Sequence, residues 1–442
     1  MDVDYDVIIL GTGLTECILG GLLSVEGKKV LQMDRNSYYG GAAASLNLKD
    51  LYMKFNRTLE AERFGKFRDW SVDLVPKFLM AQGKLVRLLV HTKVTRYLQF
   101  SLIKGSYVYS KGKIHKIPSN EKEAFTSSLL SLFQKYKFRN MLKAAISFDK
   151  DDVSTHDSVK PSMTMKEVYS KFGLDQPAQQ MTGHSIALHT TDAYSKKNCV
   201  ETIERIQLYY NSLGSYGESP YMYPLYGLGE LPQAFSRLSA VYGGTFMLRK
   251  PISNIEVIND MVHVTSEGET ARAKVVIGDP SYFPEKVKVV SRVVRAYCIL
   301  DHPINNTNNS PSCQVILPQL ECDRKHDIYI SCVGFDNKVA VDGKYMAIVC
   351  TTVETENPKE ELKLALDLLK PIMDKIITVD DVYEQSQDTR EDNIFISRSY
   401  DASTHFETTC DNILDIYQQV TGRQFKFDDK VIGFDEDGVI NE

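Results

Sequence analysis

The sequence lacks the features that would place the protein in a membrane, outside the cell or on nucleic acid. It contains no apolar run approaching the roughly 20 residues that a membrane-spanning helix needs. A strand-like run begins almost at once, so we expect no signal peptide, and the last four residues do not form a prenylation box. Acidic residues outnumber basic ones, 58 to 52, whereas nucleic-acid binders need a basic surface. These absences favour a cytosolic protein.

Close pairs of metal-binding or disulfide-forming residues are also missing. The eight cysteines have no short paired spacing, and most lie in apolar, strand-like runs. His184 and His189 are too widely spaced to lie one above the other on a helix, as ligands four residues apart would. His405 and Cys410 have no third residue that would orient them for nucleophilic catalysis. We therefore predict buried thiols in a reducing compartment, no metal site and no catalytic nucleophile.

The chain is long enough for more than one hydrophobic core. It has 442 residues, of which 43% are hydrophobic and 25% charged, as is typical of a soluble globular protein. Helical periodicity dominates residues 119–221, whereas strands dominate before this stretch and alternate with helices after it. We predict an α/β domain in two parts, residues 1–118 and 222–442, with a smaller all-helical domain inserted at 119–221. Within the α/β domain we expect a hairpin around Gly112 and helices near 358–377 and 406–420.

The first part of the chain carries a pattern of strand, glycine turn, helix and second strand. The apolar run at residues 5–10 predicts a strand buried on both faces. Gly11 and Gly13 turn the chain into the helix, and the second strand stops on Asp34. This order is the front half of a dinucleotide-binding fold, in which a pyrophosphate approaches the helix N-terminus and the distal acid holds a ribose hydroxyl.

Glu16 breaks this dinucleotide-binding pattern. The fingerprint needs a small residue there, and a carboxylate in the first helical turn repels a phosphate and fills space where backbone and ligand should meet. A glycine doublet after the second strand still resembles that of flavoproteins of the amine oxidase kind. We predict that the flavoprotein-like, FAD/NAD(P)-binding-like fold is kept and that no FAD or other cofactor binds. The vestigial motif comprises Gly11, Gly13, Glu16 and Asp34.

Four stretches of the sequence are highly specific when taken together, although none suffices alone. They are Gly-Thr-Gly-Leu-Thr-Glu at 11 to 16, Arg-Asn-Ser-Tyr-Tyr-Gly-Gly at 35 to 41, Tyr-Gly-Leu-Gly-Glu-Leu-Pro-Gln at 226 to 233 and Ser-Tyr-Asp-Ala-Ser-Thr-His-Phe-Glu-Thr-Thr-Cys at 399 to 410. With these stretches the chain resembles the Rab GDP-dissociation inhibitor family over essentially its whole length. Ser37 departs from the proline usual in that family, and Ala234 from a glycine.

The resemblance implies a non-catalytic cytosolic carrier of Rab GTPases. Such a carrier binds GDP-loaded, geranylgeranylated Rab proteins, slows GDP release and extracts them from membranes during vesicle trafficking. It would be a monomer that touches membranes transiently and binds no nucleic acid. The residues implied for reading the Rab switch regions are Tyr39, Glu230, Arg237, Thr245 and Met247.

The resemblance also implies that the helical domain shelters the geranylgeranyl lipid. The residues of this domain carry over least well from the family, so we choose candidates from its apolar positions. The predicted lipid-binding residues are Phe133, Met141, Leu142, Ile146 and Leu188.

Two alternative functions remain open from the sequence. A flavin-dependent oxidoreductase of the amine oxidase type would use the same glycines and Asp34 but is opposed by Glu16. A Rab escort protein would share the GTPase-binding surface, but such proteins typically carry long insertions that are absent here.

Overall fold

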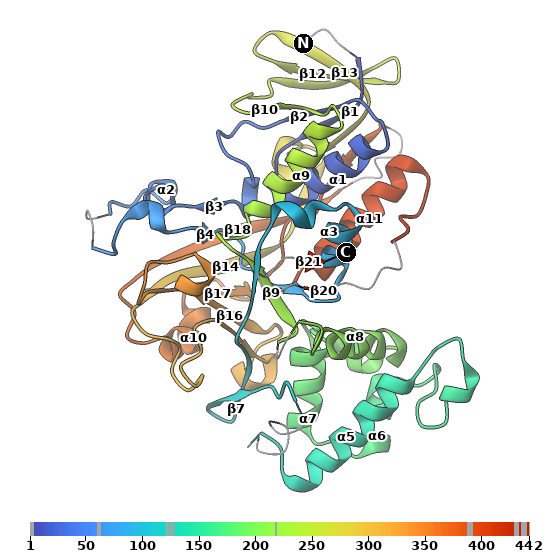
Figure 1. Ribbon diagram of the computed structural model, residues 1–442, viewed down its shortest axis with the longest axis vertical. Coiled ribbons are helices and arrows are strands. Elements are labelled where there is room, and N and C mark those ends of the chain that lie inside the picture. The colour runs from blue at the N-terminus through green and yellow to red at the C-terminus, as the bar shows by residue number, and fades with distance from the viewer. Residues whose placement is uncertain are drawn as a thin grey trace.

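A group of helices lies at one end of the protein, and two large β-sheets occupy the rest. The computed structural model describes residues 4–59, 63–120, 123, 127, 129–216, 219–386, 392–427, 433–434 and 440–441. Figure 1 shows the helical part, coloured turquoise to green, at the lower end of the long axis. The chain therefore begins in the sheet-containing part, builds the helical part and returns.

The first sheet is organised around β1 (Asp4–Leu10), as the sequence predicts. Ile9 packs into the core shared with the neighbouring helices, whereas Ile8 and Leu10 pack into a separate core on the other face. Burial on both faces explains the continuous apolar run. The strand order is β10, β2, β1, β13, β12, β11, with β19 beside β13. The bounds are Val30–Met33 (β2), Thr245–Met247 (β10), Asn254–Ile258 (β11), Met261–Ser266 (β12), Glu269–Gly278 (β13) and Ile394–Ile396 (β19).

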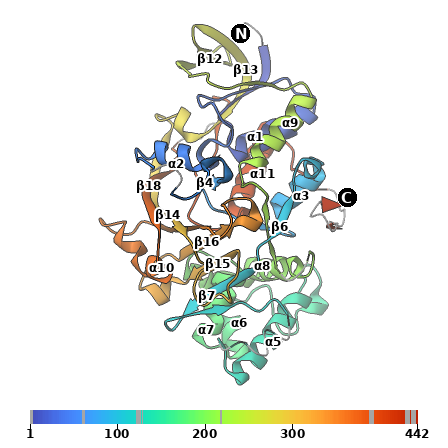
Figure 2. The ribbon, with the colours of Figure 1, turned by 60° about the vertical axis from the view of Figure 1, so that its left-hand side comes forward.

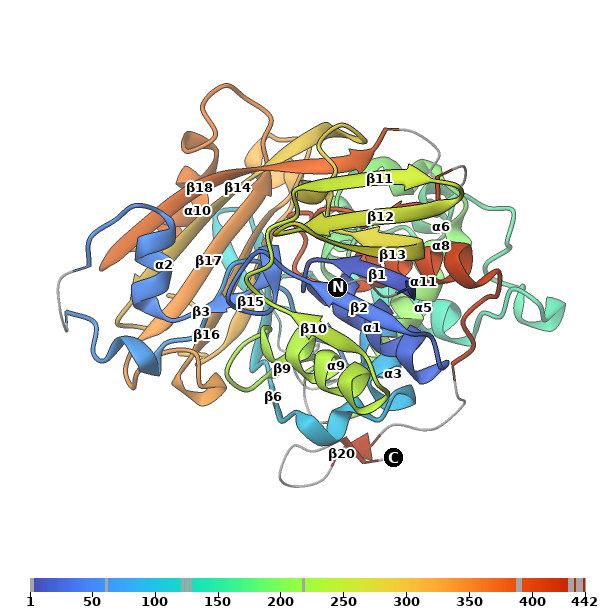
Figure 3. The same cartoon turned by 90° about the horizontal axis from the view of Figure 1, so that it is seen from above.

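The second sheet lies beside the first, and its long strands β14 and β18 are clear in Figure 3. Its order is β18, β14, β17, β16, β15, β7, β8, and only the pairing of β15 with β7 is parallel among the described strand pairs of this sheet. The hairpin predicted around Gly112 is confirmed as β7 and β8. The bounds are Gly105–Ser110 (β7), Lys113–Lys116 (β8), Val287–Leu300 (β14), Cys313–Leu317 (β15), Ile328–Gly334 (β16), Tyr345–Thr352 (β17) and Asp374–Gln385 (β18).

Helices α1 (Leu14–Val25), α9 (Glu230–Val241) and α11 (Glu407–Thr421) pack together beside the first sheet. Gly422 ends α11 in a left-handed conformation, as expected of a helix-terminating glycine. The remaining short elements connect these layers. They are α2 (Leu48–Lys54), α3 (Lys84–His91), α10 (Lys363–Leu368), β3 (Ser45–Leu46), β4 (Val72–Asp73), β5 (Leu79–Met80), β6 (Phe100–Leu102), β9 (Tyr221–Pro224), β20 (Gly433–Phe434) and β21 (Ile440–Asn441).

The helical part contains α5 (Leu132–Ser147), α6 (Met165–Phe172), α7 (Gln176–Gln180), a π-helix (Met181–Ile186) and α8 (Cys199–Ser212). Local signals fix several of these boundaries. The Ser131 hydroxyl accepts a hydrogen bond at the start of α5, and Thr164 and Glu167 form a capping box on α6. The sequence predicts one helix over residues 124–146, of which 124–126 and 128 lie outside the described residues. The described residues 127 and 129–131 are not helical, because Ser131 caps α5 and the helix begins only at Leu132.

The predicted helix at 358–377 is wrong over its second half. The helix α10 ends at Leu368, and the chain enters the long strand β18 at Asp374. Pro371 has no backbone N–H and cannot continue the helix. Ile376 is buried in the core, and β18 pairs along β14 over most of its length. Tertiary pairing therefore decides the conformation of this segment.

A buried charged group joins the helical part to the second sheet. His184, in the π-helix, lies with Nδ1 2.7 Å from Asp327 Oδ2 and Nε2 2.9 Å from Asp192 Oδ1. Burial opposes protonation, but the carboxylates of Asp327 and Asp192 outweigh it and raise the pKa of His184 to about 9. Gln319 binds both carboxylates, through its backbone N–H to Asp327 and its side-chain amide to Asp192. We call His184, Asp192, Gln319 and Asp327 the junction.

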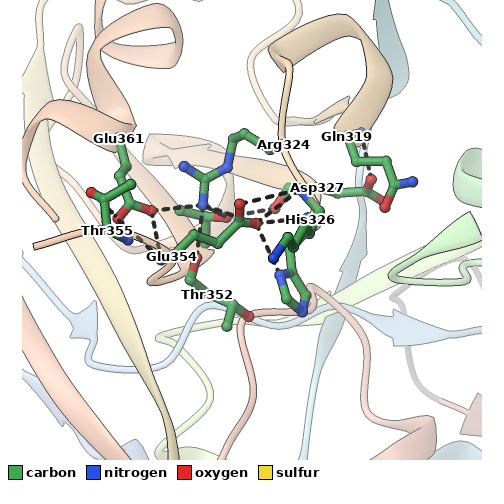
Figure 4. Close-up of polar contacts among 10 residues, drawn as sticks. Gln319, Arg324, His326, Asp327, Thr352, Glu354, Thr355 and Glu361 are labelled. Atoms are coloured by element: carbon green, nitrogen blue, oxygen red, sulfur yellow. Dashed lines mark hydrogen bonds and ion pairs between the residues drawn. The ribbon is translucent and has the colours of Figure 1, made fainter.

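A second charge cluster holds the segment that carries Asp327. Figure 4 shows Arg324 between the carboxylates of Glu354 and Glu361, at 3.4 and 2.7 Å. Glu354 also accepts hydrogen bonds from the backbone N–H of His326 and contacts its ring. Arg324 and Glu361 are nearly inaccessible to solvent, so these contacts are only weakly screened. The junction therefore rests on a fixed loop.

Replacing Asp327 with Asn should destabilise the protein by about 3–5 kcal/mol at pH 7, because it leaves a buried imidazolium without its main partner. The raised pKa of His184 contributes stability that is complete below its ordinary value of 6.5 and is lost as the pH rises through about 9. The difference in unfolding free energy between wild type and Asp327→Asn should therefore narrow from pH 6.5 to pH 10, as measured by urea unfolding. The matched control is Asp336→Asn. It removes an exposed carboxylate just after β16, the strand that Asp327 precedes. A difference that stays constant across this pH range would contradict the charged junction.

Candidate functional site

The glycine turn after β1 is closed by a second glycine turn. Gly11 has φ of +105°, a conformation that favours glycine. The backbone N–H of Gly40 donates to the carbonyl oxygen of Thr12 at 2.8 Å. A Cβ added to Gly41 would lie 3.4 Å from the backbone nitrogen of Gly13. The glycine doublet thus lets the two turns approach each other closely.

Glu16 occupies the space in front of the turn. Its side chain is only 2% exposed, and its Oε2 would clash with a Cβ on Gly13. Its Oε1 accepts a hydrogen bond of 2.6 Å from Ser397 Oγ. Burial and the nearby Asp279 raise the pKa of Glu16 to about 8. The carboxyl group therefore lies where the fold would place a phosphate.

Asp34, the residue that would hold a ribose in a dinucleotide-binding protein, is bonded to its own chain. Its Oδ2 accepts hydrogen bonds from the backbone N–H and the hydroxyl of Thr12, at 2.8 and 2.6 Å. Its Oδ1 accepts from the backbone and side-chain amides of Asn36, at 2.7 and 2.9 Å. These four bonds use the lone pairs that a ribose would need.

A cavity of about 330 Å³ remains beside the turn, lined by the vestigial motif and by the C-terminal segment that follows β19. Arg295, buried in its wall, pairs with Asp380 at 2.8 Å and is not free to bind a phosphate. Glu16 faces the position of the pyrophosphate, and Asp34 is already bonded. At these two positions of the motif the residues present do not fit a flavin dinucleotide.

The helix that starts at this turn supports α9 on its other side. A Cβ on Gly21 would lie 3.2 Å from the Phe235 ring and 3.3 Å from the Leu238 side chain, closer than most Cβ contacts, so glycine allows the two helices to pack without displacing these side chains. The hydroxyls of Ser24 and Ser239 are 2.7 Å apart, which adds a polar contact to the buried interface. Helix α9 is thereby held rigidly on α1.

Of the five residues implied for binding a GTPase, two lie on α9, two lie on β10, the edge strand of the first sheet, and one lies in the loop after β2. We call Tyr39, Glu230, Arg237, Thr245 and Met247 the platform. Tyr39 is half-buried, with its ring 6.3 Å from that of Phe246 on β10. Thr245 and Met247, also half-buried, are held by parallel pairing of β10 with β2. These side chains offer partly exposed anchors on a rigid edge.

Helix α9 contributes the charged part of the platform. Glu230 lies in its first turn, where a carboxylate is favoured, and burial raises the pKa of this residue. Arg237, two turns later, is exposed and places its guanidinium 4.3 Å from the centre of the Tyr97 ring. Phe246 was not predicted as a site residue, because only contacts between distant parts of the chain bring it beside Tyr39.

The helical part contains a cavity of about 1320 Å³, larger than most small-ligand pockets. It lies between α5, α8, the π-helix and the segment that follows β8. Its lining residues are mostly apolar, and the apolar ones include Ile117, Leu130, Leu132, Phe138, Leu142, Ile146, Met181, Ile186, Ile206, Tyr209 and Leu213. A cavity of this size and character can hold a long hydrocarbon chain.

The predicted lipid-binding residues occupy different positions around this cavity. Leu142 and Ile146 line it, whereas the other three are not among the described lining residues. Met141 is 1% exposed and packs in the helical core, and Leu188 is buried with φ of +55°. Phe133 is 67% exposed. One position separates Met141 from Leu142, so periodicity alone could not assign their faces.

The histidines and cysteines have structural surroundings. His184 belongs to the junction, and His189 bonds the hydroxyl of Thr202 and stacks on Tyr194 at 4.2 Å. Burial and the positive charge of Arg205 lower the pKa of His189 to about 3. All cysteines are unpaired; Cys322 is half-buried and the others are buried, which confirms the prediction of buried thiols. In the described part of the chain, no group of three or more His, Cys, Asp or Glu could hold a metal.

Comparisons with known proteins agree with this arrangement. The model of a family described as GDP dissociation inhibitor matches residues 1–431. The chain is 54% identical over 433 residues to Rab GDP dissociation inhibitor beta of Rattus norvegicus, covering 97% of each protein. The crystal structure of a Rab GDI from Plasmodium falciparum matches with a TM-score of 0.92 and 43% identity, over 97% of this chain and 100% of that chain.

An oxidoreductase from Methanosarcina mazei shares only the fold, with a TM-score of 0.59 and 15% identity over 94% of this chain and 100% of that chain. This likeness confirms the predicted α/β, flavoprotein-like fold class. Among the described residues, no helix is long and apolar enough to span a bilayer. Because the family model spans nearly the whole chain and the rat relative is more than half identical to it, the protein belongs to the GDP dissociation inhibitor family.

Proposed function

We propose that the protein is a cytosolic, non-catalytic carrier that binds GDP-loaded, geranylgeranylated Rab GTPases and removes them from membranes. The observation that carries this proposal is the presence of two separate sites, the platform and the large apolar cavity, in one member of this family. The related rat and Plasmodium proteins are both named as Rab GDP dissociation inhibitors. The match to the GDP dissociation inhibitor family over nearly the whole chain does not favour the two alternative functions, a flavin-dependent oxidoreductase and a Rab escort protein.

The platform would discriminate GDP from GTP through the switch loops of the GTPase. These loops change arrangement when the γ-phosphate is lost, and a protein favours one state only by binding it more tightly. The platform offers an exposed cation at Arg237 and a half-buried carboxylate at Glu230 on one rigid helix. Binding there would stabilise the GDP-bound arrangement and slow nucleotide release.

The cavity would supply the free energy that extraction requires. A lipid chain gains about 0.8 kcal/mol per buried methylene in a bilayer, so a carrier must offer a comparable apolar environment. The cavity of about 1320 Å³ between α5 and α8 provides one. Occupying the platform first makes insertion of the lipid effectively intramolecular, which increases the overall affinity.

The vestigial dinucleotide motif would serve as structure rather than as a cofactor site. Glu16 fills the phosphate position, and Asp34 is bonded to Thr12 and Asn36. We propose that the protein binds no flavin.

Arg237→Ala should weaken binding of a GDP-loaded, prenylated Rab protein by about 1 to 4 kcal/mol, because it removes a charged interface anchor. The melting temperature should hold, since the side chain is exposed. Affinity is measured by fluorescence titration and stability by thermal unfolding. The matched control, Lys359→Ala, removes an exposed cation far from the platform. Parallel loss of affinity and melting temperature would show that Arg237 is structural.

Leu142→Gln should impair extraction of prenylated Rab from liposomes by about tenfold or more, because it places an amide in the apolar cavity wall. Binding of unprenylated Rab should change little. Met141→Gln is the matched comparison on the same helix: it targets the core, so it should lower the melting temperature of the protein. Equal loss of both Rab forms by a folded Leu142→Gln variant would contradict a purely lipid-binding role for the cavity.

Purified protein should be colourless and should show no change in flavin fluorescence on titration with FAD. The physical reason is steric, because the Glu16 side chain fills the space in front of the glycine turn, and its raised pKa leaves the carboxyl group mostly uncharged at pH 7. Release of stoichiometric flavin on denaturation would overturn this part of the proposal.

A further inference from the structure

Helix α5 concentrates positive charge at the mouth of the cavity. Its sixteen residues include Lys135, Lys137, Arg139 and Lys143 and no acidic residue. Three of these basic residues line the cavity, and no carboxylate is among the described lining residues. The whole chain carries a net charge of -6, whereas α5 itself has basic residues and no acidic ones.

Large apolar side chains stand in solvent beside these charges. Leu132, Phe133 and Tyr136 on α5 are 72%, 67% and 64% exposed, and Tyr210 on α8 is 50% exposed. Leu132, Tyr136 and Tyr210 line the cavity directly. Single exposed apolar residues need no explanation, but a group around one opening marks a contact surface.

The position of α5 suits contact with an extended surface. Figures 1 and 2 both place α5 at the end of the molecule farthest from the first sheet. A lipid chain that passes through water between bilayer and cavity loses its apolar environment on the way. An opening applied directly to the bilayer removes that barrier.

We propose that α5, together with Tyr210, docks the mouth of the cavity on the anionic surface of a phospholipid bilayer. This inference rests on the proposed function, because it assumes that the cavity receives a membrane lipid. Arg139 and Lys143 meet the negative headgroups, and the aromatic and aliphatic side chains enter the interfacial layer. An acidic protein segment could pair with the same cations, but the continuity of the exposed apolar side chains with the lipid cavity favours the bilayer.

The test is flotation of the protein alone with vesicles of phosphatidylcholine, with or without phosphatidylserine. Wild type should bind the vesicles that contain phosphatidylserine, more weakly at high salt, and should not bind phosphatidylcholine alone. Arg139→Glu with Lys143→Glu should reduce binding by about tenfold or more. Phe133→Ser should weaken it through loss of apolar insertion. Lys166→Glu with Lys171→Glu, an equal change of charge at exposed positions of α6, should leave it intact.

Three outcomes would overturn the docking surface, provided that circular dichroism shows each variant folded. These are absence of binding to the anionic vesicles, equal loss in the α6 control, and vesicle binding that survives the α5 changes while binding of unprenylated Rab is lost. The last result would assign α5 to the GTPase. A titration of wild type with GDP-loaded Rab without vesicles separates the two proposals: binding to Rab but not to vesicles rejects only the docking surface, whereas binding to neither rejects the carrier function.

Discussion

The close packing of α1 against α9 at Gly21 connects the glycine turn of the vestigial dinucleotide motif to the platform. A Cβ at Gly21 would meet the Phe235 ring at 3.2 Å, so the absence of a side chain there lets the two helices pack more closely than a larger residue would allow. The other end of α1 is fixed by Glu16, whose carboxyl group lies against the glycine turn. A motif that positions a cofactor in enzymes of this fold here positions α9, the helix that carries Glu230 and Arg237 of the proposed platform.

The junction gives the same rigidity across the two parts of the molecule. His184 between Asp327 and Asp192 ties the π-helix, which forms one wall of the cavity, to the loop before β16. Arg324 and its two glutamates hold that loop in turn. Breaking a buried pair of this kind costs much more than an exposed one, so the arrangement resists relative movement of the two parts. A carrier with two sites benefits from this constraint, because effective concentration depends on a fixed geometry between them.

Short-range sequence patterns predicted many of the helices and strands, but they identified few of the residues that line the cavity. The apolar run of β1 and the Gly112 hairpin depend on neighbouring residues, and both were predicted correctly. The segment at 374–377 was predicted as helix but forms the start of β18, because its pairing with β14 decides its conformation. The same limit explains Met141 and Leu142: adjacent apolar residues on one helix face the core and the cavity respectively, and only the packing of α8 and the π-helix distinguishes them.

Glu16 is a single residue from which a change in the dinucleotide site could be predicted. Its position in the first turn of α1 predicted that the dinucleotide site had changed, and the structure places its carboxyl group against Gly13. The hydrogen bonds of Asp34 to Thr12 and Asn36 could not be predicted from the sequence. An acidic residue at the end of the second strand is also what a functional dinucleotide site requires.

The most direct test of a two-site carrier is a set of binding affinities measured by titration for four forms of one Rab protein. The forms are prenylated and unprenylated, each loaded with GDP or a non-hydrolysable GTP analogue. If the platform reads the nucleotide state and the cavity binds the lipid, removing the lipid and replacing GDP should each weaken binding. The two losses in binding free energy should then be nearly additive, because the sites lie on separate parts of a rigid molecule. Equal affinity for prenylated and unprenylated Rab, or for the GDP and GTP-analogue forms, would contradict this function.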